Sequence, residues 1–267
     1  MKAFISPQWQ TLLQENGFHH LEDFWQLPKE WVEPPNYRRG GWSGVTRWIL
    51  KNTMGESYVI YIKRQLNHTH RGLRHPFKGE PTAQREFRGI QRCRKKNIPV
   101  LEPIFFQKKK SKEGLQTVLV TAELKGYQSI ESWMAYWQST HFPSRIQRLF
   151  IIKNIAQAVA QLHYHGFQHG CLHDKHIFMQ WNNDHHIDIA FIDLEMLKWL
   201  PHRAALRDIY ALDQYSPGWN RKERLAFIKY YWGDTYALSS TAKKFWRKLQ
   251  QRHKDKQRRK MQRAKKC

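Results

Sequence analysis

The chain of 267 residues carries 46 lysines and arginines against 22 aspartates and glutamates, a formal net charge of +24. With 40% apolar residues and 12 tryptophans it has enough apolar material for a core, which excludes global disorder. The length fits one bilobal domain or two small ones. The positive charge indicates a polyanionic partner, and nucleic acid, an anionic membrane surface or a phosphorylated substrate would all satisfy it. The alternative is a basic, solvated surface without such a partner.

Cysteine usage and apolar patterning bear on location. Three cysteines, Cys93, Cys171 and Cys267, form no Cys-x-x-Cys spacing, which favours a reduced, cytosolic protein. The first ten residues lack the apolar run of a secretory signal, and no stretch reaches the length of a membrane span. We therefore expect a cytoplasmic protein that, where membranes are involved, lies on them and does not cross them.

The first 36 residues mix aromatic and charged side chains and end in the breaker sequence Glu33-Pro34-Pro35-Asn36. This pattern predicts a short helical lead-in. Gly40, Gly41 and Gly44 follow, then a strand over 46–50, a turn and a strand over 58–63. Because glycine permits close backbone approach, this hairpin could fold over phosphates, although an ordinary glycine-rich turn explains the pattern as well.

Lys63 ends the second strand, and Glu86 lies on a helical stretch over 80–94. A strand lysine held by a helix glutamate keeps its ammonium oriented toward nucleotide phosphates. The intervening segment 64–78 is rich in arginine and histidine and is expected to be a basic loop, either solvated or open to an anionic acceptor. Strands over 100–106 and 117–121, around a turn at 108–111, would complete a small antiparallel sheet.

Two helices follow the sheet. Glu123 lies in the linker, where an adenine could receive backbone hydrogen bonds. A helix is predicted to begin near Ser129, and the apolar spacing over 144–165 predicts a long helix that stops at Gly166.

The next stretch is a compact polar loop with His169, Cys171, Asp174 and His176, followed by strands over 177–179 and 187–191. The turn between these strands is expected at Asn182-Asn183-Asp184. Asp193 comes directly after the second strand. This order is the plan of a kinase catalytic loop followed by a metal-binding acid.

The histidines of this region allow a second interpretation, because imidazole is a common metal ligand. Five are close in sequence: His163, His165, His169, His173 and His176. They match neither His-Glu-x-x-His nor a zinc-finger spacing, and they run from a helix into a loop. Satisfied structural histidines are therefore favoured over a zinc site.

The remaining chain is predicted to be helical and basic. A helix is expected over 219–232, with Ser216 or Asn220 as its start. The segment 243–266 reads as a basic helix or tail that would suit an anionic membrane surface, nucleic acid or plain solvent.

The ordered set of glycine hairpin, Lys63, Glu86, the loop over 169–176 and Asp193 resembles the lipopolysaccharide kinase family of heptose and Kdo kinases. The central loop looks closest to the InaA branch, and Arg207-Asp208-Ile209-Tyr210-Ala211-Leu212 matches the segment that such proteins carry after the metal-binding acid. The resemblance covers roughly residues 38 to 233. An ordered set is more specific than any one of its members.

The resemblance implies an α+β, protein-kinase-like bilobal fold with an N-terminal antiparallel β-rich lobe and a reduced helical C-terminal lobe. The expected parts are a lead-in (1–36), the nucleotide-binding lobe (37–124), the catalytic lobe (125–240) and a basic helix or tail (241–267). ATP and Mg²⁺ are the implied cofactors. By position, Lys63 would contact phosphates, Glu86 would hold Lys63, and Asp193 and His176 would bind the metal.

The chain departs from this pattern at Cys171, which stands where active kinases of this type carry the catalytic aspartate. A thiol cannot orient an acceptor hydroxyl and hold its proton as a carboxylate does. Asp174 could substitute as the base or interact with the metal. The expected activity is transfer of phosphate to a sugar hydroxyl of lipopolysaccharide core or a related glycolipid. The alternatives are a nucleotide-binding protein without transfer and a basic protein that binds nucleic acid or membrane surfaces.

Overall fold

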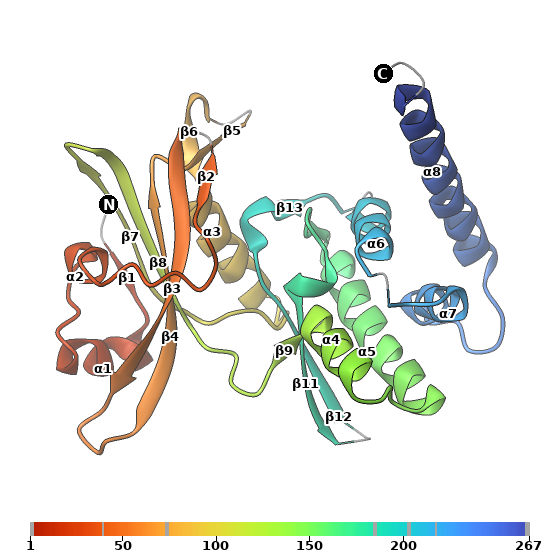
Figure 1. Cartoon of the computed structure of the whole chain (residues 1–267), viewed down its shortest axis with the longest axis horizontal. Helices are drawn as coiled ribbons and strands as arrows, with labels where there is room; N and C mark the ends of the chain where they lie inside the picture. Colours follow the sequence, from red (N-terminus) through yellow and green to blue (C-terminus); the bar gives the residue numbers. More distant parts are fainter. Residues whose placement is uncertain are drawn as a thin grey trace. The chain divides into compact units, whose positions relative to one another are not determined.

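The computed structural model describes residues 3–38, 40–72, 75–183, 186–201, 204–216 and 218–264. The chain forms two compact units (Figure 1). Unit 1 comprises Met1–Gly126 and Phe191–Leu197, and unit 2 comprises Tyr127–Ala190 and Lys198–Cys267. The second segment of unit 1 is short, but it carries Asp193.

Within the described residues, unit 1 is built on a six-stranded antiparallel sheet in the order β1-β7-β8-β4-β3-β2. Its strands are β1 (Phe4–Ile5), β2 (Asn36–Arg38), β3 (Gly41–Lys51), β4 (Ser57–Leu66), β7 (Pro103–Ser111) and β8 (Gly114–Ala122). The long hairpin of β3 and β4 pairs Trp42 with Leu66 and Lys51 with Ser57, which confirms the predicted pair of strands.

Helices cover both faces of this sheet. One face packs against η1 (Pro7–Trp9), α1 (Gln10–Glu15) and α2 (Leu21–Trp25), and the other against α3 (Thr82–Arg94). Successive side chains of a strand point to opposite faces. Accordingly Phe105 contacts Phe24 at a ring distance of 4.7 Å, while its neighbour Phe106 stacks on Phe87 of α3 at 4.6 Å.

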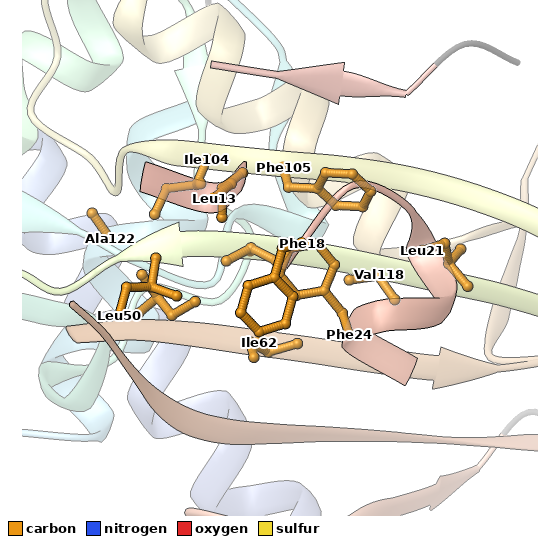
Figure 2. Close-up of a cluster of buried hydrophobic side chains, with 12 residues drawn as sticks. Leu13, Phe18, Leu21, Phe24, Leu50, Ile62, Ile104, Phe105, Val118 and Ala122 are labelled. Atoms are coloured by element: carbon orange, nitrogen blue, oxygen red, sulfur yellow. The ribbon is translucent and has the colours of Figure 1, made fainter. Parts of the chain in front are cut away.

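The buried apolar cluster under α1 and α2 is the core of the first face (Figure 2). Phe18 stacks on Phe24 at 4.5 Å, and both lie among residues of four strands. Its members are Leu13, Phe18, Leu21, Phe24, Leu50, Ile60, Ile62, Ile104, Phe105, Val118, Val120 and Ala122. Burying a large apolar side chain stabilises the fold by roughly 1.5–3 kcal/mol. The helical lead-in predicted from the sequence is thus an integral part of the core, and its β1 also extends the sheet.

The predicted basic loop over 64–78 is wrong. Strand β4 continues to Leu66, and β5 (Thr69–Gly72) and β6 (His75–Pro81) form a further hairpin. Arg64 is fully buried, and its guanidinium donates to the carbonyls of Leu27 at 2.6 Å and Pro28 at 2.8 Å. The charge that suggested a solvated loop instead ties the chain after α2 to the sheet. Arg74, within the predicted loop, lies outside the described residues.

The turn predicted at 108–111 is also misplaced. Strand β7 runs to Ser111, where it pairs with Gly114, so that the turn falls at Lys112 and Glu113. Lysines 108 to 110 belong to the strand and pair with residues of β8. Long lysine side chains can extend their charges into water from a strand position, which is why a basic run did not mark the turn.

Unit 2 combines helices with short strands. The helices are α4 (Ile130–Ser139), α5 (Arg145–Tyr164), α6 (Ala204–Gln214), α7 (Arg221–Tyr231) and α8 (Ser240–Ala264). The strands β9 (Gln128–Ser129), β11 (Ile177–Asn183) and β12 (His186–Phe191) form one sheet in the order β12-β11-β9, and β10 (Phe167–Gln168) pairs with β13 (Lys198–Trp199). Two short 3-10 helices lie before and after the β11–β12 hairpin in the sequence. They are η2 (Asp174–His176) in unit 2 and η3 (Leu194–Met196) in unit 1.

Capping confirms the helix starts predicted from the sequence. The side chains of Ser129, Ser144 and Asn220 each accept a hydrogen bond from a backbone N–H in the first turn of α4, α5 and α7. Helix α5 ends before Gly166, whose φ of +76° suits glycine. The predicted turn at 182–184 follows β11, but Asp184 lies outside the described residues.

The basic C-terminal segment is helical through Ala264, so the helix alternative of the prediction is confirmed there, and residues 265–267 lie outside the described part. No helix among the described residues combines the length and apolar character needed to cross a membrane.

Candidate active site

The first group of predicted site residues comes together in unit 1. Lys63 on β4 and Glu86 on α3 form an ion pair, with Lys63 Nζ donating to Glu86 Oε2 at 2.6 Å. Burial by itself would lower the pKa of Lys63. The negative charges of Glu86, Asp193 and Glu195 outweigh that effect and raise the pKa. The ammonium therefore stays charged over the physiological pH range.

Asp193 is the N-cap of η3, directly after the strand that ends at Phe191. The backbone N–H of Phe191 donates to the carbonyl of Pro99 at 3.0 Å, which fixes the strand end to unit 1. Asp193 adopts the left-handed conformation, with φ 57° and ψ 56°. An aspartate tolerates this region at a modest cost in backbone energy, and such conformations gather at functional sites.

Gly89 allows the Asp193 turn to lie directly against α3. A Cβ at Gly89 would lie 2.9 Å from the carbonyl oxygen of Leu194 and 3.0 Å from its Cβ, closer than real contacts permit. Glu86 and Gly89 are three residues apart and therefore share one side of the helix. The same helix side thus holds Lys63 and accepts the backbone that follows Asp193.

The predicted nucleotide-binding glycines lie at the start of β3. Gly40, with φ 77°, is in the turn that joins β2 to β3. A Cβ at Gly41 would lie 1.9 Å from the carbonyl oxygen of Leu66, and one at Gly44 would lie 2.5 Å from the Trp31 ring. Packing within unit 1 therefore requires Gly41 and Gly44 to be glycine, whatever else they bind. Glu123 follows β8, and its backbone N–H donates to the carbonyl of Val59 at 3.1 Å.

The second group of predicted residues lies in the loop of unit 2, whose start is fixed by Asp208 of α6. This fully buried carboxylate accepts from the backbone N–H of His169 at 2.6 Å and of Gly170 at 2.8 Å. Its Oδ2 also lies 3.1 Å from His163 Nε2. Asp208 therefore joins the end of α5, the loop and α6. In the sequence, the segment 207–212 matches the family, but the match predicts no role for Asp208.

Cys171, Asp174 and His176 follow within this fixed loop. Cys171 is partly exposed, whereas Asp174 and His176 of η2 are buried. Burial raises the pKa of Asp174, whose Oδ1 accepts from the backbone N–H of Lys175 at 2.9 Å. His176 Nδ1 lies 2.8 Å from the carbonyl oxygen of Cys171. His173, whose Nε2 lies 3.8 Å from Cys171 Sγ, also belongs to this group, as does Glu195 to the first. From the sequence, His173 is only one of five histidines expected to be structural, and Glu195 has no predicted role.

Comparison with known proteins identifies the family. Residues 22–231 match the model of the lipopolysaccharide kinase (Kdo/WaaP) family. The chain belongs to this family. It is 31% identical over 178 residues to Protein InaA of Escherichia coli (strain K12), a match that covers 67% of this chain and 78% of that protein. The resemblance predicted from the ordered residues, including the InaA branch, is confirmed.

A solved structure of a lipopolysaccharide kinase family relative has the same fold. The structure of "WaaP in complex with acyl carrier protein" superimposes with a TM-score of 0.61 at 19% sequence identity, covering 88% of this chain and 90% of that chain. The predicted mixture of an antiparallel sheet and helices is confirmed. Membership of a kinase family implies the use of ATP.

Proposed function

We propose that this lipopolysaccharide kinase family member transfers phosphate from ATP, with Mg²⁺, to a sugar hydroxyl of lipopolysaccharide core or a related glycolipid. The observation that carries the proposal is the charge arrangement of unit 1. The pair of half-buried Lys63 and buried Glu86 lies close enough to Asp193 and Glu195 for their carboxylates to raise the pKa of the lysine. Kinase chemistry needs such fixed charges more than it needs covalent help.

The residues of unit 1 fit both parts of a magnesium nucleotide. Carboxylate oxygens are the ligands that Mg²⁺ prefers, and a lysine ammonium is a good partner for phosphate. When bound, Mg²⁺-ATP supplies the phosphoryl group. Lys63 would hold the phosphates, Glu86 would orient Lys63, and Asp193 would hold the metal. Glu195 adds negative charge beside this pair, which makes it a further candidate ligand.

The backbone offers the remaining contacts with the nucleotide. We propose that the turn at Gly40 and Gly41, with Gly44 beyond it, approaches the phosphates, and that the backbone at Glu123 binds the adenine. These roles are consistent with the strand order, because the glycines begin β3, the strand next to the one that carries Lys63.

The transfer step would be carried by the loop of unit 2. Asp208 fixes the backbone of His169 and Gly170 and so determines where Cys171, Asp174 and His176 lie within the loop. A carboxylate that accepts the proton of the sugar hydroxyl is required, and Asp174 is our candidate because Cys171 occupies the usual position. His176 stands where protein kinases carry the metal-binding asparagine and keeps that proposed role.

We further propose the protein-kinase-like bilobal arrangement, with the parts 1–36, 37–124, 125–240 and 241–267 as its divisions. A cytoplasmic location with peripheral attachment to the inner face of the inner membrane fits an acceptor that is a glycolipid. The exposed basic helix α8 is the candidate for that attachment, because lysines and arginines bind anionic lipid head groups.

The test is a calorimetric titration of the full chain with ATP, with and without Mg²⁺. We expect Mg²⁺-dependent binding in the native chain and its loss in Asp193→Ala. The control is Asp255→Ala, which removes a carboxylate on α8 that accepts from Gln251, and binding should be unchanged there. Equal binding in the native chain and Asp193→Ala would refute the proposed role of unit 1.

Cys171 favours a second candidate, a nucleotide-binding protein or stress protein without phosphoryl transfer, and the net charge of +24 favours a third, a basic protein that binds nucleic acid or a membrane surface. Affinity for a polyanion such as nucleic acid or anionic vesicles should then fall steeply with salt and survive Asp193→Ala. Nucleic acid is a less favoured partner than a glycolipid acceptor, because the chain belongs to a lipopolysaccharide kinase family.

A further inference from the structure

Three potential metal ligands converge in the loop of unit 2. Cys171, His173 and His176 each offer one ligand atom, and these atoms all lie within 4.8 Å of one another. The sequence drew attention to five histidines without a recognisable spacing. Two of these histidines, His173 and His176, lie close to Cys171, because the 3-10 turn over Asp174–His176 brings the chain back over Cys171.

The spacing is close to that of a tetrahedral metal site. Bonds of about 2.0–2.1 Å to imidazole and about 2.3 Å to thiolate place tetrahedral ligand atoms roughly 3.3–3.8 Å apart. Cys171 Sγ and His173 Nε2 are already 3.8 Å apart. Side-chain rotations that move the remaining ligand atoms by about 1 Å would bring them to this spacing.

A backbone contact fixes the tautomer of His176. The carbonyl oxygen of Cys171 can only accept, so His176 Nδ1, 2.8 Å away, must donate its hydrogen. In the neutral ring this leaves the lone pair on Nε2, and a carbonyl that fixes the tautomer in this way is the usual outer partner of a metal-bound histidine. The His173 ring is stacked within 8° on the His176 ring and packs on Tyr215 at 4.0 Å, so His173 must turn out of this stack for both imidazole lone pairs to point at one cation.

We propose that Cys171, His173 and His176 bind a transition-metal cation of the Zn²⁺ class. One thiolate and two imidazoles suit Zn²⁺ and are poor ligands for Mg²⁺. The thiol releases its proton to solvent on binding. Three protein ligands leave a fourth position for water or another ligand, as in open zinc sites. The site shares His176 with the proposed Mg²⁺ site and contains Cys171 of the proposed catalytic loop, but Zn²⁺ binding needs neither nucleotide nor phosphoryl transfer and can be tested without them.

Two readouts test the site on the full chain without nucleotide or Mg²⁺, in a Cys267→Ser background that leaves Cys93 and Cys171 as the thiols. Zn²⁺ affinity is measured by competition with a chromophoric chelator. Co²⁺ is the spectroscopic probe, because thiolate ligation gives a charge-transfer band and a tetrahedral site gives intense visible bands. We expect one Zn²⁺ per chain and both Co²⁺ signatures.

The variants Cys171→Ser and His173→Ala should each weaken Zn²⁺ binding at least about 100-fold, since loss of even an outer partner costs 10–100-fold. Cys171→Ser should also abolish the charge-transfer band. The control His141→Ala changes an exposed histidine outside the cluster and should bind like the parent. Thermal unfolding of each apo variant separates lost binding from lost folding.

Absence of stoichiometric Zn²⁺ binding by the parent would overturn the proposal. An unchanged affinity and charge-transfer band in folded Cys171→Ser would overturn it equally. Because no nucleotide is present, neither outcome depends on whether the chain is an active kinase.

Discussion

Units 1 and 2 carry the family's pattern to different degrees. In unit 1 the strand lysine, the helix glutamate and the acid after the hairpin are all present, and Lys63 and Glu86 lie 2.6 Å apart. In unit 2 the buried Asp208 accepts hydrogen bonds from the backbone at the start of the loop. The side chains that this loop brings together, however, are one thiol and two imidazoles. The backbone hydrogen bonds to Asp208 therefore fix the loop whatever side chains the loop carries at positions 171, 173 and 176.

The strongest test of this comparison removes the scaffold of unit 2. Asp208→Ala leaves two backbone N–H groups and His163 without their buried acceptor, and we expect a loss of about 3–5 kcal/mol in the free energy of unfolding. Urea denaturation measures it. The control Asp255→Ala on α8 should stay within about 0.5 kcal/mol of the native chain. A loss below about 1 kcal/mol would show that Asp208 does not hold the loop.

The two described cysteines offer a second test, since one lies in each unit. Burial raises the pKa of the Cys93 thiol to about 12, whereas Cys171 is partly exposed. Relative to an ordinary thiol of pKa about 8.5, Cys93 should have about a thousand-fold less thiolate and react correspondingly slowly with iodoacetamide. Mass spectrometry of the Cys267→Ser chain at pH 8 in chelator measures both rates.

Both thiols should react readily in urea, which controls for the reagent. Similar rates for Cys93 and Cys171 in the folded chain would mean that α3 opens frequently, contrary to the tight packing of unit 1.

A third test places an aspartate at position 171 of unit 2, where active kinases of this type carry their catalytic aspartate. Cys171→Asp should raise Mg²⁺-dependent ATP turnover about 100-fold, because a positioned general base contributes about that much or more. Turnover is followed by phosphate or ADP release. The matched variant Cys171→Ser supplies no carboxylate and should show no gain. Equal turnover in all three proteins would place the limiting step elsewhere than at Cys171.

The smallest expected effect concerns the helix that leads into the loop. Ser144 caps α5 in a reciprocal pair with Gln147, so Ser144→Ala should cost about 1 kcal/mol of stability. Thermal unfolding measures the change. Ser139→Ala, at the exposed end of α4, is the control and should have little effect. An equal cost in both variants would argue against a specific role for the cap.

Much of the fold could be predicted from local patterns. Two strand-forming runs with a turn between them predicted the hairpin of β3 and β4, and the caps Ser129, Ser144 and Asn220 predicted three helix starts. The pairing of Lys63 with Glu86 was predictable because a known order of elements brings them together. In each case the information lies within a few residues or in the order along the chain.

Other features could not be predicted because they depend on distant partners. Arg64 resembles any surface arginine until the carbonyls at the end of α2 surround it, and the predicted loop was wrong for that reason. His163 and Asp208 are 45 residues apart, so their contact left no spacing to recognise. The cluster of Cys171, His173 and His176 depends on the turn of η2, which sequence spacing did not indicate.

Gly89 has a consequence for motion within unit 1. The backbone after Asp193 lies against α3 where a methyl group would not fit, and Glu86 lies one turn away on the same helix. A sliding or rotation of α3 would therefore push on the Asp193 turn and pull on Lys63 at the same time. The three charged residues are mechanically linked, so any conformational change that opens one of these contacts must disturb the others.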